Sequence, residues 1–144
     1  MTTTTVTRSV QAPADRVFAA VAEPESLTEV IPDVVRVMFL TPQHTGRGTR
    51  FQETRLMRGK EAMTELEITE HEPPHRVRYV ADSHGTVWDT VFAVTSSGEG
   101  TEVVLTMEAR AHRLLPRLLN PLFKSLIRKG LEKHLDAVKA WCEA

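Results

Sequence analysis

The chain has 144 residues, of which 41% are hydrophobic and 26% are charged, and its formal net charge is −1. This balance is typical of one globular domain, here residues 1–144, and it excludes the strongly basic character of most nucleic-acid-binding proteins. No apolar run approaches the roughly 20 residues of a membrane span, and the N-terminus lacks a signal-peptide pattern. Cys142 is the only cysteine, so an internal disulfide is excluded and a reducing cytoplasm is the expected location.

The first quarter of the chain predicts one strand followed by two short helices. Residues 3–10 are rich in β-branched side chains, which favours a strand, and Pro13 ends it. Apolar residues then recur at helical spacing across residues 13–23, before a second proline stops that helix. Residues 24–30 predict another short helix, which ends before Pro32 because a residue that precedes proline avoids the helical conformation.

Residues 34–111 change to an alternating pattern of apolar and polar side chains, which is typical of strands. Short turns that contain glycine or proline divide this region into six predicted strands. The strands cover residues 34–40, 49–57, 61–70, 75–82, 86–94 and 101–111. Because short turns join consecutive strands, we expect antiparallel pairing and, with the first strand, a sheet of about seven strands.

A long amphipathic helix is predicted over residues 120–141. Asn120 and Pro121 suit its N-cap and its first helical position. With about 100° between residues, one face holds Phe123, Ile127, Gly130, His134, Val138 and Trp141. Gly130 and His134 stand in the middle of this face, where a helix on a filled core normally places leucine or isoleucine. We therefore expect the helix to cover a hollow.

This element order predicts an α+β fold, in which a curved antiparallel sheet wraps around the long C-terminal helix and two short helices follow the first strand. Several segments also resemble the START-like (SRPBCC) superfamily. They are residues 9–18 (SVQAPADRVF), 46–51 (GRGTRF), 70–77 (EHEPPHRV), 90–92 (TVF) and 100–103 (GTEV). The resemblance spans nearly the whole chain and implies the helix-grip fold of that superfamily. The most similar branch looks like the polyketide cyclase/dehydrase and lipid-transport group.

The resemblance implies function only in broad terms. Members of that group share sequence patterns but differ in activity, and the matching segments specify strands and turns rather than a catalytic site. No catalytic residue of the family corresponds to a position of this sequence. The resemblance therefore implies a ligand cavity between sheet and helix, and it leaves the ligand open.

The inward-facing positions of the predicted strands supply candidate ligand-binding residues. If Phe51 points inward, Glu53 and Arg55 follow it on the same face of the sheet. The candidates are Phe51, Glu53, Arg55, Leu66, Tyr79, Trp88, Thr90, Leu105, Met107, Gly130 and His134. A mostly apolar wall with a few directional polar groups is typical of small-molecule sites. The alternatives are a His134 held by one hydrogen bond in the core or rim, and a rim ion pair between Glu53 and Arg55.

Motifs for metal binding and nucleophilic catalysis have no support in the sequence. His71 and His75 satisfy the letters of H-E-x-x-H, but the two prolines between them oppose the helix that the motif needs. The other histidines lack ligand spacing, and G-x-S-x-G, P-loop and dinucleotide-binding motifs are absent. We therefore predict no metal site and no cofactor, and we assign no catalytic residue.

A second feature is a basic, leucine-rich segment over residues 109–131, in which the cations Arg110, Arg113, Arg117, Lys124, Arg128 and Lys129 are interleaved with leucines. The stretch from Ala109 to Leu131 contains no acidic residue. Such a segment can dock on an anionic membrane surface. Alternatively, it forms a short turn that packs at the sheet edge with solvated cations, or a lid at the cavity mouth.

Three functional hypotheses follow. The first is binding of a small hydrophobic molecule, either lipid-, quinone- or polyketide-like. The second is polyketide cyclase, aromatase or dehydratase chemistry, with His134, Tyr79 or Glu53 as acid or base. Arg55 would then stabilise an enolate. The third is a peripheral membrane or protein-partner module. We expect no nucleic-acid partner, and the sequence leaves the oligomeric state open.

Overall fold

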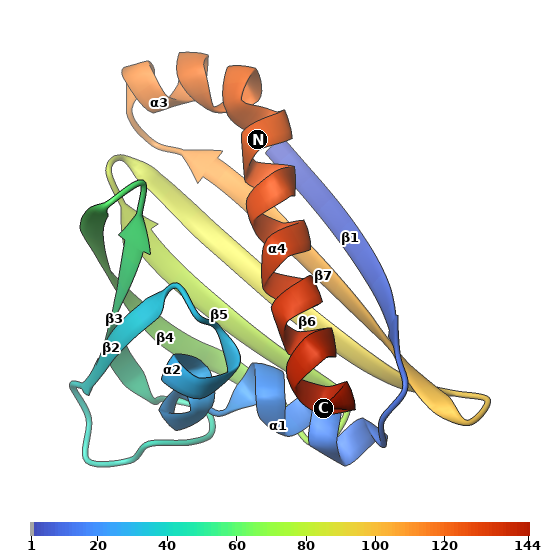
Figure 1. The fold of residues 1–144 in the computed structure, drawn as a ribbon. Coiled ribbons are helices and arrows are strands. Elements are labelled where there is room, and N and C mark those ends of the chain that lie inside the picture. The colour runs from blue at the N-terminus through green and yellow to red at the C-terminus, as the bar shows by residue number, and fades with distance from the viewer. Residues whose placement is uncertain (1) are drawn as a thin grey trace.

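A computed structural model describes residues 2–144, in which seven antiparallel strands form one sheet around a C-terminal helix (Figure 1). The strands are β1 (Thr2–Val10), β2 (Val34–Phe39), β3 (Arg50–Met57), β4 (Lys60–Glu72), β5 (Arg76–Ser83), β6 (Thr86–Ser97) and β7 (Gly100–Ala111). The helices are α1 (Ala14–Ala22), α2 (Leu27–Val30), α3 (Leu114–Leu119) and α4 (Lys124–Glu143), with 3₁₀ turns η1 (Pro24–Ser26) and η2 (Asn120–Phe123). The predicted α+β helix-grip fold is confirmed. No helix within residues 2–144 has both the length and the apolar character needed to cross a bilayer.

The sheet order places the long helix against one face. Consecutive strands from β2 to β7 are neighbours, and β1 pairs with β7 at the far edge. α1, η1 and α2 connect β1 to β2 and lie at one end of the curved sheet (Figure 1). Alternate side chains such as Phe92 and Val94 in β6, or Val103 and Leu105 in β7, are buried. One face of the sheet therefore forms the core, as the two-residue period predicts.

The C-terminal half of α4 is anchored on β1, along which the helix runs (Figure 1). Its buried side chains are Leu131, Leu135, Val138 and Cys142. At the surface, Arg8 Nε donates to the Asp136 carboxylate at 2.7 Å, and Lys139 Nζ donates to the carbonyl of Ser9 at 2.6 Å. Apolar burial thus fixes this half of the helix, and polar contacts to β1 flank the buried stripe.

Arg16 of α1 caps the end of α4. Its Nε donates to the carbonyl of Cys142 at 3.0 Å and its Nη2 to that of Trp141 at 3.1 Å, while the guanidinium lies 4.4 Å from the Trp141 ring centroid. The last carbonyls of a helix lack partners within it, and a cation there also interacts favourably with the helix dipole. The Cys142 thiol is buried beside this cap, and burial raises its pKa above the ordinary value.

The main helix begins later than we predicted. It starts at Lys124, whereas Asn120–Phe123 form the 3₁₀ turn η2. The Asn120 side chain does not cap the helix, because its Nδ2 donates to Thr86 Oγ1 at 3.0 Å. The predicted N-cap is therefore wrong, since this side chain is held by β6.

The buried face of α4 is also rotated from the predicted one. Val138 belongs to both the predicted and the observed buried face. Phe123 and Gly130 are exposed, however, and Leu131 and Leu135 are buried in their place. The cause is that α4 packs along β1 at one edge of the sheet, so that the hollow lies beside its buried stripe.

The segment before α4 is helical where we predicted a turn. α3 tolerates Pro116 because this residue stands in the first turn, where its missing N–H would have no partner. No side chain of α3 or η2 is buried. Arg110 does not share this surface: it lies on β7 and pairs with Asp89 at 3.2 Å and Glu108 at 2.6 Å, on the sheet face opposite α4.

Candidate functional site

A cavity of about 450 Å³ lies between the concave face of the sheet and α4. Small-molecule pockets typically have volumes of roughly 300–1,000 Å³. The structure places all eleven candidate residues on the wall of this cavity. They are Phe51, Glu53, Arg55, Leu66, Tyr79, Trp88, Thr90, Leu105, Met107, Gly130 and His134. Five consecutive strands, β3 to β7, and α4 therefore contribute to one surface.

Ten further residues complete the wall. They are Val21, Leu27, Met57, Thr64, Ala81, Ser83, Phe92, Leu126, Ile127 and Leu131. Met57 and Ala81 continue the alternation of the predicted strand positions, so the same two-residue period could have identified them. Val21 and Leu27 come from α1 and α2, and no sequence signal indicated that these short helices reach the cavity.

A row of aromatic rings crosses the wall from β3 to α4. Phe51 and Tyr79 meet edge to face, with ring centroids 6.1 Å apart, and Tyr79 meets Phe92 in the same way at 6.0 Å. The ring of Phe92 then lies 5.5 Å from that of His134. Edge-to-face contacts of this kind are favourable and orient the rings. The row gives the cavity a stiff apolar wall that ends at the His134 imidazole.

Glu53, Arg55 and His134 form a polar cluster on this wall. The alternation of β3 directs both Glu53 and Arg55 inward, where Glu53 is buried and Arg55 is half-buried. Arg55 Nε donates to Glu53 Oε1, and Arg55 Nη2 donates to His134 Nδ1 at 3.2 Å. A buried carboxylate is costly unless it is paired, and Arg55 supplies the opposite charge. The rim ion pair considered from the sequence is thus part of the cavity wall.

The geometry of the cluster defines the protonation of His134. Burial, reinforced by the Arg55 cation, lowers the pKa of this imidazole to about 3. His134 is therefore neutral at pH 7 and carries one N–H. Because Nδ1 accepts the hydrogen bond from Arg55, the proton resides on Nε2. Nε2 has no acceptor within residues 2–144, so it is a hydrogen-bond donor that a ligand in the cavity can use.

Tyr79 contributes packing rather than acid–base chemistry. Its hydroxyl donates to the carbonyl of Val21 at 2.5 Å. Burial, followed by the nearby charges of Glu53 and Glu23, raises the pKa of Tyr79 above its ordinary value. The phenol therefore stays protonated, and its proton is directed at the backbone. This contact removes Tyr79 from the candidate acids and bases.

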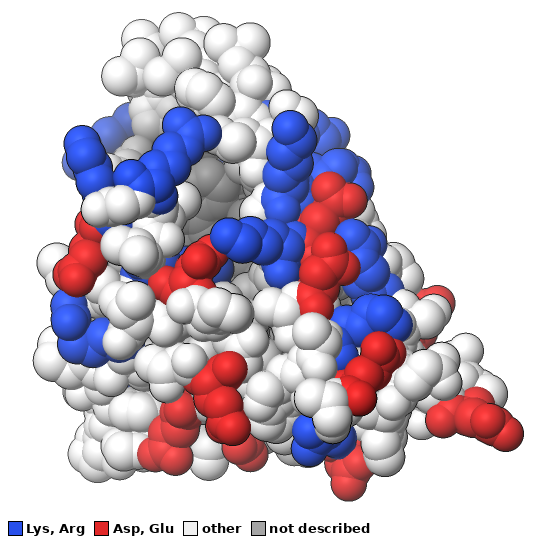
Figure 2. Space-filling view, viewed as in Figure 1, with Lys and Arg blue, Asp and Glu red and all other residues white. Residues whose placement is uncertain are grey.

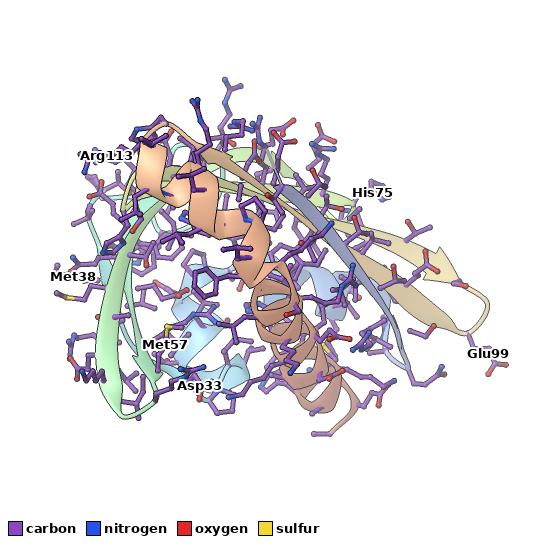
Figure 3. All side chains as sticks on the ribbon, turned by 90° about the horizontal axis from the view of Figure 1, so that it is seen from above. Asp33, Met38, Met57, His75, Glu99 and Arg113 are labelled. Atoms are coloured by element: carbon purple, nitrogen blue, oxygen red, sulfur yellow. The ribbon has the colours of Figure 1, made fainter. Side chains whose placement is uncertain are left out.

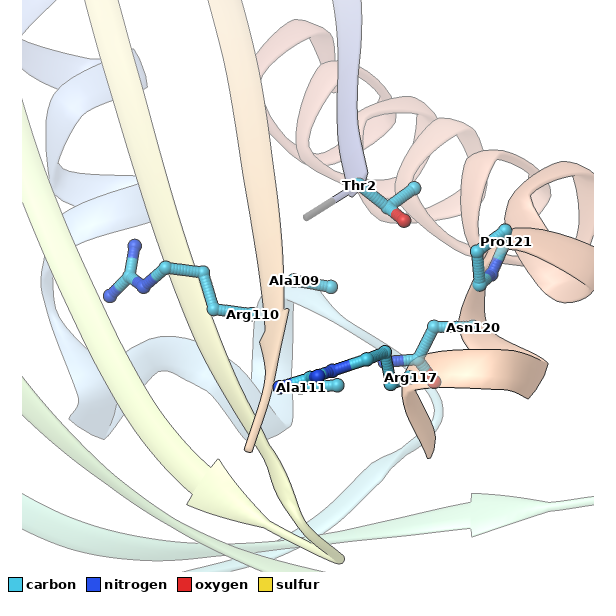
Figure 4. A pocket seen from close by; sticks show the side chains of 7 residues that line it. All are labelled: Thr2, Ala109, Arg110, Ala111, Arg117, Asn120 and Pro121. Atoms are coloured by element: carbon cyan, nitrogen blue, oxygen red, sulfur yellow. The ribbon is translucent and has the colours of Figure 1, made fainter. Parts of the chain in front are cut away.

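A second cavity of about 340 Å³ lies where β7 and β1 meet α3 and η2 (Figure 4). It is lined by Thr2, Ala109, Arg110, Ala111, Arg117, Asn120 and Pro121. Figure 4 shows the Arg110 side chain directed away from the other lining residues, toward its acidic partners on β6 and β7. Mostly small side chains remain, and we assign no ligand to this cavity.

The described residues do not assemble a metal site. Within residues 2–144, no group of three or more His, Cys, Asp or Glu side chains is placed to hold a metal ion. The H-E-x-x-H letters fall on β4 and the turn after it, and the His71 ring packs 5.5 Å from that of Phe18.

Comparison with known proteins places the chain in a family. The family described as "Polyketide cyclase / dehydrase and lipid transport" matches residues 1–143. No curated protein sequence matches the chain. Among solved structures, TTHA0849 from Thermus thermophilus is 22% identical, with 96% of this chain and 95% of that chain covered and a TM-score of 0.77. A START superfamily protein from Mycobacterium smegmatis is 15% identical, with coverages of 98% and 97% and a TM-score of 0.81.

A third similar structure belongs to a longer protein. It is the di-domain ARO/CYC BexL from the BE-7585A biosynthetic pathway, which is 18% identical with a TM-score of 0.80. The alignment covers 99% of this chain but 50% of BexL. At these identities the three structures show a shared fold. By its family match, the chain belongs to the polyketide cyclase/dehydrase and lipid transport family.

Proposed function

We propose that this protein binds a small hydrophobic molecule in the cavity between the sheet and α4. The observation that carries the proposal is a cavity of about 450 Å³ with a largely apolar wall and one cluster of directional polar groups. Gly130 adds no side chain to this wall, and a Cβ built there would meet no neighbouring atom within 4 Å. The family description, which includes lipid transport, supports the same class of ligand.

The polar cluster narrows the class of ligand. Glu53 neutralises Arg55, and His134 is neutral at pH 7, so the cluster carries no net charge. It offers the Nε2–H of His134 and the remaining N–H groups of Arg55 as donors. A neutral acceptor, such as the carbonyl of a quinone or polyketide-like ring, satisfies these donors. The carboxylate of a free fatty acid would instead bring an unpaired charge into the cavity, which is costly.

A thermal-shift experiment tests the proposal. The purified protein is heated with a naphthoquinone, an anthraquinone and a fatty acid of similar size, and we expect the two neutral carbonyl compounds to raise Tm. Thr90→Phe, which fills part of the cavity, should abolish these shifts. Met38→Phe is the matched control, because Met38 is exposed on edge strand β2, outside the cavity. If no compound shifts Tm, or if both variants respond as the wild type does, the proposal is wrong.

A cyclase, aromatase or dehydratase activity on a polyketide-like substrate is the second candidate. The Nε2–H of His134 and an N–H of Arg55 could together stabilise the oxygen of a developing enolate. With a pKa of about 3, His134 is not a base at neutral pH, which leaves Glu53 for that role. Glu53→Gln keeps the shape of the side chain and removes its charge.

Turnover distinguishes the enzyme from the carrier. If the protein is an enzyme, Glu53→Gln should lower the turnover of a poly-β-keto thioester by roughly 10²-fold or more, the usual contribution of a general base. Ligand-induced Tm shifts of this variant should change far less. If the wild-type protein binds the compound without converting it, the enzyme hypothesis is wrong and the binding hypothesis remains.

A further inference from the structure

The start of the C-terminal helical segment exposes an unusual density of large apolar side chains. We call this surface the apolar tip; it comprises Leu114, Leu115, Leu118, Leu122, Phe123 and Leu126. These side chains are between 48% and 74% exposed. Figure 1 shows α3 standing beyond the sheet at the end of the molecule away from α1. Contiguous apolar surface of this kind is rare on a monomer and marks a contact site.

Cations surround the apolar tip. They are Arg113, Arg117, Lys124, Arg128 and Lys129, and residues 109–131 contain no acidic residue. None of the five forms an ion pair with another described side chain. In Figure 2, side chains that are neither acidic nor basic cover the end formed by α3, Lys and Arg gather below it, and Asp and Glu lie mostly toward the opposite end. The surface at the tip is therefore both apolar and positive.

The β3–β4 hairpin extends this surface across the mouth of the cavity. Its Met57 is 59% exposed, and Arg58 and Lys60 flank the glycine of the turn between the strands. Met57 and Leu126 both line the cavity, one from the hairpin and one from α4. Viewed down onto this end, Figure 3 places Met57 and Arg113 on one side of the molecule and Glu99 far on the other. The apolar and basic surface thus borders the cavity mouth.

The cations around the apolar tip decide which kind of partner can bind there. A second copy docked tip to tip would bring two uncompensated positive surfaces together, which is unfavourable. Nucleic acid would satisfy the cations but would leave the leucines exposed to water. An anionic bilayer satisfies both features, because its headgroups complement the cations and its acyl boundary receives the leucines.

We propose that the apolar tip docks on the surface of an anionic membrane, with α3, η2 and the first turn of α4 in the interfacial layer. The surrounding cations then face the lipid headgroups, and the cavity mouth opens toward the bilayer. An apolar guest could pass between lipid and cavity with little exposure to water. Docking itself does not depend on the cavity being able to bind a ligand.

Vesicle co-sedimentation tests the proposal. The full chain is mixed with phosphatidylcholine vesicles that contain either no anionic lipid or about a third phosphatidylglycerol. We expect binding to the anionic vesicles only, weakened when salt screens the headgroups. The double substitution L118E/L122E should reduce binding at least tenfold, because it places carboxylates among the headgroups. Met38→Glu is the control, since this exposed methionine lies on edge strand β2 rather than on the tip.

Charge variants test the electrostatic half of the proposal. The triple substitution R117Q/K124Q/K129Q removes three cations and should weaken binding to anionic vesicles by roughly tenfold or more, since each basic residue near the surface contributes several-fold. Sedimentation with neither vesicle, or equal binding by wild type and L118E/L122E, would overturn the proposal. Analytical ultracentrifugation then tests the second copy as occupant: a dimer that L118E/L122E dissociates would indicate it, and a monomer would exclude it.

Discussion

The two ends of the C-terminal helical segment are built in opposite ways. At the C-terminal end, four side chains of α4 are buried and Arg16 holds the last carbonyls. At the N-terminal end, the apolar tip leaves its leucines in solvent, and no side chain of α3 or η2 is buried. Both ends contain leucine, so hydrophobicity alone does not distinguish them. The contrast shows that one end stabilises the fold, while the other is free for a contact outside the chain.

The largest expected effect comes from truncating one leucine at each end. Leu135 is fully buried, and Leu135→Ala should lower the free energy of unfolding by about 2–5 kcal/mol through lost burial and a residual cavity. Leu118 is 62% exposed, and Leu118→Ala should change it by less than about 0.5 kcal/mol. Urea denaturation at pH 7 measures both. Equal losses would show that the tip is part of the folded core.

Between the two ends, His134 should make stability depend on pH. Its pKa is about 3 in the folded protein against 6.5 when unfolded, so the unfolded chain binds more protons between these values. The free energy of unfolding should therefore rise with pH from about 3 to 6.5, by at most about 1.4 kcal/mol per pH unit from this group. Denaturation at several pH values gives the free energy of unfolding as a function of pH. This dependence should be weaker for His134→Asn than for the wild type.

A surface histidine provides the control for this pH dependence. His75 is exposed, and His75→Asn should follow the wild-type curve. If His134→Asn also follows it, the imidazole is not held neutral by the cavity wall.

The cap at the anchored end should have a smaller effect. Arg16→Met keeps an unbranched side chain over Trp141 but loses the bonds to two carbonyls and the favourable dipole interaction. We expect a loss of about 1–2 kcal/mol in the free energy of unfolding, measured by urea denaturation. Arg117→Met, at the tip, should cause almost no loss. A larger loss of stability from Arg117→Met than from Arg16→Met would contradict the view that only the C-terminal end stabilises the fold.

The smallest expected effect is a gain in stability. Gly130 lies within α4, where glycine is less favourable than alanine by about 1 kcal/mol, and an added Cβ would meet no atom within 4 Å. Gly130→Ala should therefore raise the free energy of unfolding by roughly 0.5–1 kcal/mol, as measured by thermal or urea denaturation. A destabilised variant would mean that the helix backbone at this position is not free to accept a side chain.

The strands and their inward positions could be predicted because a sheet has a simple period. Once Phe51 is placed inward, Glu53 and Arg55 must follow, and the antiparallel register brings Tyr79 and Thr90 beside each other. All eleven candidates accordingly line one cavity, although their role in binding stays a prediction.

The helical segment was predicted less well because its surroundings determine its phase. A hydrogen bond from Asn120 to Thr86, on a strand far away in sequence, replaced the expected cap. Packing along β1 rotated the buried stripe toward Leu131 and Leu135. Nor could the leucine pattern reveal that α3 stays outside the core. Each of these outcomes depends on tertiary contacts that the local sequence does not contain.

The position of Cys142 gives the molecule an internal reporter. This thiol is buried at the anchored end of α4, next to the carbonyls that Arg16 holds. A labelling reagent can reach it only when that end detaches from α1 and β1. The rate of labelling in the native protein therefore measures how often the last turns of the helix open, and vesicles bound at the distant tip need not obstruct the reaction.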